Sequence, residues 1–179
     1  MTVDEIFTKL AEHMIEGIMT HNDLMRAYNF LGLYGFAKSH EYHYLEESGG
    51  YVRLLGYYST RYHKLLNVQN IPKPEIIPDT WYKYTTMAVD ANTKRQAVKS
   101  MMDKWVEWER KTKKLYQEMY KELCNINEVA AADEVKCFIC AVDEELKHAE
   151  KKLIKLETLG YDISAIVGMQ ESMYKKFNK

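Results

Sequence analysis

The distribution of proline limits this chain to a small set of folds. All three prolines of the 179 residues, Pro72, Pro74 and Pro78, lie within seven positions. Proline inside a helix removes a backbone hydrogen bond and clashes with the preceding turn, at a cost of about 3 kcal/mol. The chain on either side of this segment is therefore free to form long helices, joined by one rigid connection.

Apolar residues recur at helical spacing on both sides of the prolines, and strand-like alternation is not evident. Turn signals stand at Gly49-Gly50, at Asn125 and Asn127, and at Gly160. Because such residues end helices, we expect helices over residues 3–47, 50–68, 92–125 and 129–159, followed by a tail helix over 162–177.

The lengths of the connections predict how these helices are arranged. Short turns after the first and third helices make neighbouring helices antiparallel. The connection over about residues 67–92 is long enough to cross the molecule, so the second and third helices run parallel. The sequence thus predicts an all-α four-helix bundle, and residues 80–90 in the connection are expected to form a short helix or a lid.

Composition and charge exclude several classes of partner. Hydrophobic residues make up 46% of the chain, enough for a globular core. Lys and Arg number 25 against 26 Asp and Glu, so we expect no nucleic-acid partner, which would favour a basic excess. No apolar run is long enough to span a membrane, and no signal peptide is recognisable. Three cysteines make no disulfide framework, so we expect a cytoplasmic protein.

Residues of metal-ligand type occur in each long segment. Glu145 and His148 lie one turn apart, so a carboxylate and an imidazole can bind one metal ion together; the alternative is a solvated helix face. Glu109 lies about as far from the turn at 125–128 as Glu145 does. Asp23 and His63 lie at the same level along the bundle axis only if the first helix ends early and the turn region is long. Such polar groups in an apolar bundle are costly unless they are paired or metal-bound.

These residues and their order resemble the ferritin-like superfamily of four-helix bundles, which includes ferritins, bacterioferritins and rubrerythrin-type di-iron proteins. Asp23 followed by Leu24 opens an aromatic-rich run like that of the first ferritin helix. His63 falls where a second-helix Glu-x-x-His would end, Glu109 looks like the third-helix carboxylate, and Glu145 with His148 looks like the fourth-helix Glu-x-x-His. The resemblance covers about residues 4–160 of a single domain over 1–179, with the tail helix after it.

The resemblance implies a non-haem iron site, mononuclear or dinuclear, or a site for another divalent metal. The implied ligands are Asp23, His63, Glu109, Glu145 and His148. The implied activity is ferroxidase-like, the oxidation of Fe(II) by oxygen or peroxide, in a homo-oligomer that is a dimer or larger. The second-helix motif departs from the family, because a threonine occupies the place of a bridging glutamate.

Two other functions remain open. The threonine, Thr60, is also consistent with a catalytically inactive bundle that acts as a structural or interaction module. A di-metal oxidoreductase acting on an organic substrate is the other alternative. If the motif assignment holds, Thr60→Glu should tighten metal binding, and the site weakens if Glu107 rather than Glu109 faces inward.

Further ligand-type residues receive a plainer interpretation. Glu16 is an alternative ligand on the first helix, but we expect it at a polar edge. His40 and His43 lie one turn apart and are compatible with a surface zinc or copper site, but we expect them to be simply exposed.

Overall fold

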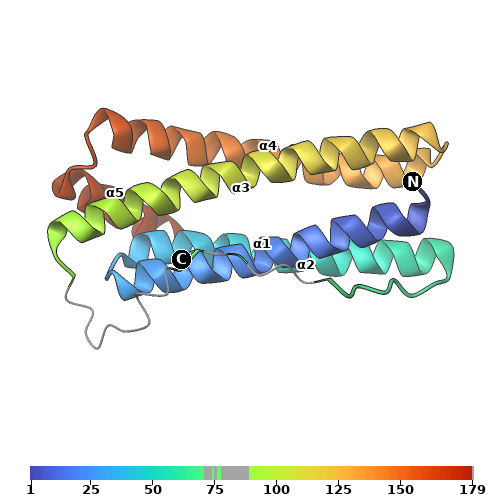
Figure 1. Cartoon of the computed structure of the whole chain (residues 1–179), viewed down its shortest axis with the longest axis horizontal. Helices are drawn as coiled ribbons and strands as arrows, with labels where there is room; N and C mark the ends of the chain where they lie inside the picture. The colour runs from blue at the N-terminus through green and yellow to red at the C-terminus, as the bar shows by residue number, and fades with distance from the viewer. Residues whose placement is uncertain (71–73, 75, 78–88, 179) are drawn as a thin grey trace.

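A computed structural model of the protein describes residues 1–70, 74, 76–77 and 89–178. Most of the expected helix or lid over residues 80–90 lies outside these described residues. Within them the chain forms five helices and no strand (Figure 1). The helices are α1 (Val3–Phe30), α2 (Tyr34–Tyr62), α3 (Ala91–Asn125), α4 (Val129–Thr158) and α5 (Ile163–Phe177). Among the described residues, no helix has both the length and the apolarity needed to cross a membrane.

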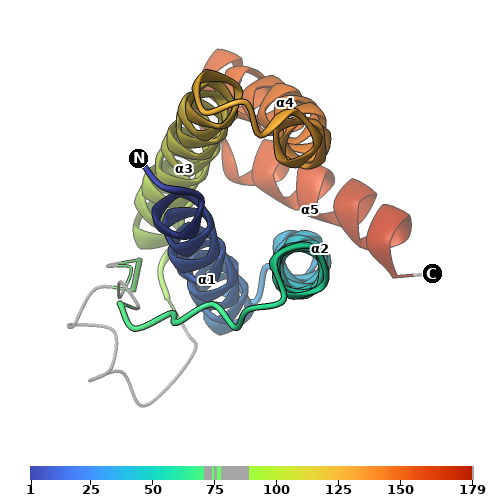
Figure 2. The ribbon, with the colours of Figure 1, turned by 90° about the vertical axis from the view of Figure 1, so that its right-hand side faces the viewer.

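The helices pair into two antiparallel hairpins. α1 packs chiefly on α2, and α3 packs chiefly on α4. Figure 1 shows that α2 ends at the end of the molecule opposite to the one where α3 begins, so these two helices run in the same direction, as the sequence predicts. Seen from the end in Figure 2, the four long helices occupy the corners of a bundle, and α5 crosses beside α2 and α4. α5 packs against α2.

The first turn lies elsewhere than the sequence predicts. α1 ends at Phe30, and the chain reverses at Leu31-Gly32-Leu33, where Gly32 takes a left-handed φ of 70°. The two leucines are buried and anchor this corner in the core. The predicted turn at Gly49-Gly50 is wrong, because both glycines lie inside α2. Glycine inside a helix costs only about 1 kcal/mol relative to alanine, which packing of the rest of α2 outweighs.

The apolar core divides into two clusters along the length of the bundle. One contains residues from the later part of α1 and the start of α2, such as Leu24 and Phe36. The other contains residues from the start of α1 and the later part of α2, such as Leu10 and Leu54. Most of the buried polar side chains, among them His21, His40 and Glu109, come from the stretches of chain between the two clusters. The bundle thus carries a polar belt around its middle.

Candidate metal centre

The polar belt draws on all four long helices. α1 contributes His21, α2 contributes His40 and His43, α3 contributes Glu109 and α4 contributes Glu145. Polar groups in such a place are stable only when other polar groups or a metal ion satisfy them. The contacts within the belt therefore decide what it can bind.

Two neutral histidines form the interior side of the belt. The Nδ1 atoms of His21 and His40 lie 3.1 Å apart, so one ring donates a hydrogen bond to the other. Burial lowers the pKa of His21 to about 3 and that of His40 well below its ordinary value. Both rings are neutral at pH 7, and the Nδ1 lone pair of one accepts this hydrogen bond, so only the donating ring keeps a free lone pair, on its Nε2.

Glu109 is the buried carboxylate of this interior side. The indole N–H of Trp105 donates a hydrogen bond of 2.8 Å to Glu109 Oε1, and His21 Nε2 lies 3.5 Å from the same oxygen. Burial raises the pKa of Glu109 to about 7, although the charge of His43 and the bond from Trp105 act to lower it. Within the described structure, Glu109 Oε2 has no hydrogen-bond partner. One oxygen is thus fixed and the other is free to bind a ligand.

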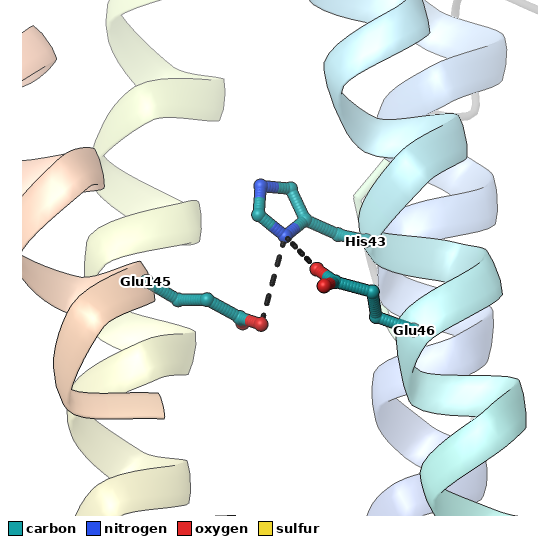
Figure 3. A group of neighbouring side chains, drawn as sticks. All are labelled: His43, Glu46 and Glu145. Atoms are coloured by element: carbon teal, nitrogen blue, oxygen red, sulfur yellow. Dashed lines mark ion pairs between the residues drawn. The ribbon is translucent and has the colours of Figure 1, made fainter. Parts of the chain in front are cut away.

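His43, Glu46 and Glu145 form the outer side of the belt (Figure 3). His43 Nδ1 lies 3.6 Å from Glu46 Oε2 and 3.8 Å from Glu145 Oε1. One ligand atom from each residue lies within 4.8 Å of the other two. Burial opposes a charge on the ring, but Glu145 and Glu46 outweigh it and raise the pKa of His43 to about 9. The two carboxylates thus favour a positive charge at His43. That charge is either the proton on the imidazole ring or a metal ion that replaces this proton.

Glu47 adds another carboxylate next to this group. Burial, and then the charges of Glu145 and Glu109, raise the pKa of Glu47 well above its ordinary value. Its carboxylate packs across the bundle on Gly17 of α1, where an added Cβ would lie only 3.2 Å from Glu47 Cδ and 3.1 Å from Trp108 Cζ2. The missing side chain at Gly17 therefore makes room for the Glu47 carboxylate in the interior.

Two cavities lead to the outer side between α2 and α4. One has a volume of about 280 Å³ and is lined by Glu46, Glu47 and Glu145 among others. The other has a volume of about 410 Å³ and is lined by Glu46, Glu145 and His148 among others. Because Glu46 and Glu145 line both cavities, an ion or a small molecule reaches the three-residue group without crossing the apolar core.

Of the five ligands predicted from the sequence, Glu145 belongs to the His43–Glu46–Glu145 group, and Glu109 lies on the interior side of the belt. Glu109 is buried and Glu107 is exposed, so α3 turns Glu109 inward. Glu145 reaches from α4 toward α2 in Figure 3. The charges of both raise the pKa of His43, which places them around one centre.

The structure does not bring the other three predicted ligands into the His43–Glu46–Glu145 group. Asp23 is buried on α1, and its carboxylate pairs with Arg26 at 3.2 Å. His148 is exposed and lines the 410 Å³ cavity. His63 caps the end of α2 in a left-handed conformation and is exposed. It follows His43 by twenty residues, which is about 30 Å along a helix.

The sequence interpretation missed the part that α2 plays. His40 and His43 are buried, so the prediction that they are exposed is wrong. The overlooked signal is His43 followed one turn later by Glu46, with Glu47 beside it. Glu16 does lie at a polar edge, where it pairs with Lys111 at 2.6 Å.

Comparison with known proteins identifies the fold. No protein-family profile and no curated protein matches the chain. Among solved structures, an open-pore ferritin from the hyperthermophilic archaeon Archaeoglobus fulgidus superposes with a TM-score of 0.78 at 15% identity, over 94% of this chain and 92% of that one. An engineered closed form of that ferritin superposes with a TM-score of 0.79 at 14% identity, over 97% of this chain and 96% of that one. A humanized archaeal ferritin superposes with a TM-score of 0.79 at 16% identity, over 95% of this chain and 93% of that one.

These similarities confirm the fold that the sequence resemblance predicts. The chain has the all-α ferritin-like fold, with four long helices, a long crossover between α2 and α3, and the short helix α5 after the bundle. At this level of sequence identity the comparison shows the fold and nothing further.

Proposed function

We propose that this protein binds a divalent metal ion, iron in the first instance, between α2 and α4. His43, Glu46 and Glu145 are the proposed ligands, and Glu47 and Glu109 lie near enough to interact with them electrostatically. The observation that carries the proposal is the convergence of three ligand atoms from two helices within 4.8 Å, at a place that solvent cavities reach.

The charges around the centre favour a cation of high charge. Glu46, Glu145 and Glu109 surround a single imidazole, and burial together with the charges of Glu145 and Glu109 raises the pKa of Glu47. A metal ion would displace the proton of His43 and relieve this repulsion. A mixed set of imidazole and carboxylates suits iron, manganese or zinc. We propose Fe(II) as the physiological ion because the fold is that of ferritins.

Oxidation of Fe(II) by oxygen or peroxide is the chemistry we propose for the bound metal. The protein's part is to bind and orient. Trp105 fixes one oxygen of Glu109, and the neutral His21 lies 3.5 Å from that oxygen. Carboxylates near the metal favour the ferric product electrostatically.

The protonated His43 supports a second candidate function. Because a charged imidazole already forms ion pairs with both Glu46 and Glu145, the group has polar partners without metal, and the bundle can serve as a structural or interaction module. Exposed Leu45 and Val52, 60% and 68% exposed and two turns apart on α2, give this module an apolar stripe. The same stripe supports a homo-oligomer, a dimer or larger. The three free cysteines are compatible with the cytoplasm.

A titration of metal-free protein with Co(II) and with anaerobic Fe(II) tests the proposal. We expect one ion to bind per chain at this centre, and Glu145→Gln and His43→Ala each to weaken binding by about ten-fold or more. Glu144→Gln is the matched control, since Glu144 is the neighbouring carboxylate and pairs with Lys147. Equal affinity of the wild type and Glu145→Gln would refute the site.

An aerobic Fe(II) titration then separates the two candidate functions. The enzyme interpretation predicts a ferric absorbance that grows faster with wild type than with Glu145→Gln. Metal binding without that difference leaves a metal-binding protein that does not catalyse oxidation. No metal binding at all favours the structural module.

A further inference from the structure

Lys152 is a largely buried cation that has no acidic partner among the residues that the structure describes. It lies on α4, one turn after His148, and its Nζ sits 4.5 Å from the centroid of the Trp105 ring. Among the described residues, no carboxylate forms an ion pair with it, in contrast to Lys147 one turn earlier. Burial, followed by the charge of Lys176, lowers the pKa of Lys152 to about 8. A cation in such a place is stabilised by an anion.

A second lysine and a histidine lie beside Lys152. Lys176 comes from α5, and its charge lowers the pKa of both Lys152 and His148, so the three groups are close in space. All three line the 410 Å³ cavity. Like Lys152, Lys176 forms no ion pair with a described carboxylate; its Nζ lies 4.9 Å from the ring centroid of Phe177.

The acidic residues of this cavity already have partners. Glu144 pairs with Lys147 at 2.9 Å, and Glu46 and Glu145 flank His43. Among the described charged residues of the cavity wall, the two lysines are therefore the ones that no ion pair engages. Its remaining wall includes apolar surface from Ala141 and Phe177.

We propose that the 410 Å³ cavity binds a small organic anion beside the metal centre. A carboxylate head group would lie against Lys152 and Lys176, and an apolar body against Phe177 and Ala141. The volume exceeds what an inorganic oxyanion fills, and the apolar wall gives an organic body its contacts. Since the cavity also reaches Glu145, the bound anion would lie next to any metal held there.

Benzoate is the probe for this site. Metal-free protein, stripped on a chelating resin rather than with a soluble carboxylate chelator, is titrated by calorimetry in a buffer without carboxylate or phosphate. We expect one benzoate per chain, with affinity lowered about ten-fold or more by Lys152→Met and by Lys176→Met, because each removes a charge-assisted contact. Lys155→Met, on the exposed side of α4, is the matched control and should bind like wild type.

Two further probes decide the chemical class. Benzamide, the neutral analogue, should not bind measurably. Inorganic phosphate should bind more weakly than benzoate, and equal or tighter phosphate binding would overturn the organic part of the proposal. Failure of benzoate to bind, or equal loss in Lys155→Met, would overturn the site itself. Because these titrations contain no metal, their outcome is independent of whether the metal centre exists.

Discussion

At the scale of single residues, Trp105 contacts two charged groups, one at the N–H edge of the indole and one over its ring face. Its indole N–H holds Glu109 Oε1 at 2.8 Å, and its face receives the ammonium group of Lys152 at 4.5 Å. The carboxylate belongs to the interior of the proposed metal centre, and the lysine belongs to the proposed anion cavity. A buried indole that serves both neighbours fixes their relative positions.

The contact from Trp105 to Glu109 makes a stability prediction. Trp105→Phe leaves a buried carboxylate oxygen without its donor, so we expect a loss of about 1–3 kcal/mol in the free energy of unfolding beyond the loss of ring volume. Trp108→Phe is the control, because the Trp108 indole N–H has no hydrogen-bond partner in the described structure. Urea unfolding of both variants compares them; equal losses would contradict the role of the hydrogen bond.

Lys152 predicts how stability changes with pH. Its pKa is about 8 in the folded protein and near 10.5 in the unfolded chain, so between these values the unfolded chain binds more protons. The free energy of unfolding therefore rises with pH from about 8 to 10.5. Lys152→Met should remove this rise and stabilise the protein at pH 7 by about 1–3 kcal/mol. Urea unfolding of the wild type and of Lys152→Met at pH 7, 8.5 and 10 measures both effects. If the free energies of unfolding of the two proteins changed with pH in parallel, the rise could not be assigned to Lys152.

At the scale of the helices, α2 is held at its start by Gln170 of α5. The N–H of Gly35 donates to the side-chain oxygen of Gln170 at 3.1 Å. A Cβ added at Gly35 would lie 1.7 Å from the backbone oxygen of Gln170, closer than any real contact. Glycine at this position lets the two backbones approach.

We therefore expect Gly35→Ala to displace α5 and to cost about 1–3 kcal/mol. Gly49→Ala is the matched control on the same helix, because nothing lies within 4 Å of its added Cβ. That variant should stabilise the protein by about 0.5–1 kcal/mol. Thermal unfolding compares the two, and limited proteolysis near residue 160 reports release of α5. Equal stability of both variants would show that the close approach does not matter.

The sequence predicts the helices of the second hairpin well and the first turn poorly. The expected helices over 92–125, 129–159 and 162–177 agree with α3, α4 and α5 to within a residue at each end. There, asparagine and glycine stand where the chain does turn. In the first hairpin, Gly32 is flanked by leucines, which are typical of a buried helix, whereas the sequence Gly49-Gly50 is typical of a turn. Only the packing of α1 and α2 on the other helices determines which of the two sites becomes the turn.

The same misplaced turn explains which parts of the site the sequence missed. Glu109 and Glu145 come from helices whose ends were predicted correctly, so their common height could be inferred. Placing the turn near residue 49 put His43 and Glu46 at the end of the bundle and moved His63 to its middle. In the structure His43 lies in the middle, and His63 ends α2.

At the scale of the whole molecule, the proposed metal links the two hairpins. α1 and α2 form one hairpin, α3 and α4 the other, and the ligands come from α2 and α4. The two cavities lie along this α2–α4 side. A bound ion would tie together helices that side-chain packing joins less closely than it joins the partners within each hairpin.

Metal binding should therefore raise the unfolding temperature. Mn(II) at about 100 times its dissociation constant should add about 2.7 kcal/mol to the free energy of unfolding. Glu145→Gln should reduce this gain to about 1.4 kcal/mol or less, because its binding is about ten-fold weaker or more. Thr60→Glu should keep the full gain, because Thr60 is exposed and follows Glu46 by about 21 Å of helix. Differential scanning calorimetry measures each shift, and an undiminished gain in Glu145→Gln would place the ion elsewhere.

The corner around Gly32 also sets the angular register of α2. One extra residue there would rotate every later side chain by about 100° about the helix axis. His43 would then leave the bundle's middle for bulk water, while all five helices kept their lengths. Two relatives of this protein can thus have the same fold and differ in whether they bind a metal. The length of the three-residue corner between α1 and α2 would distinguish them.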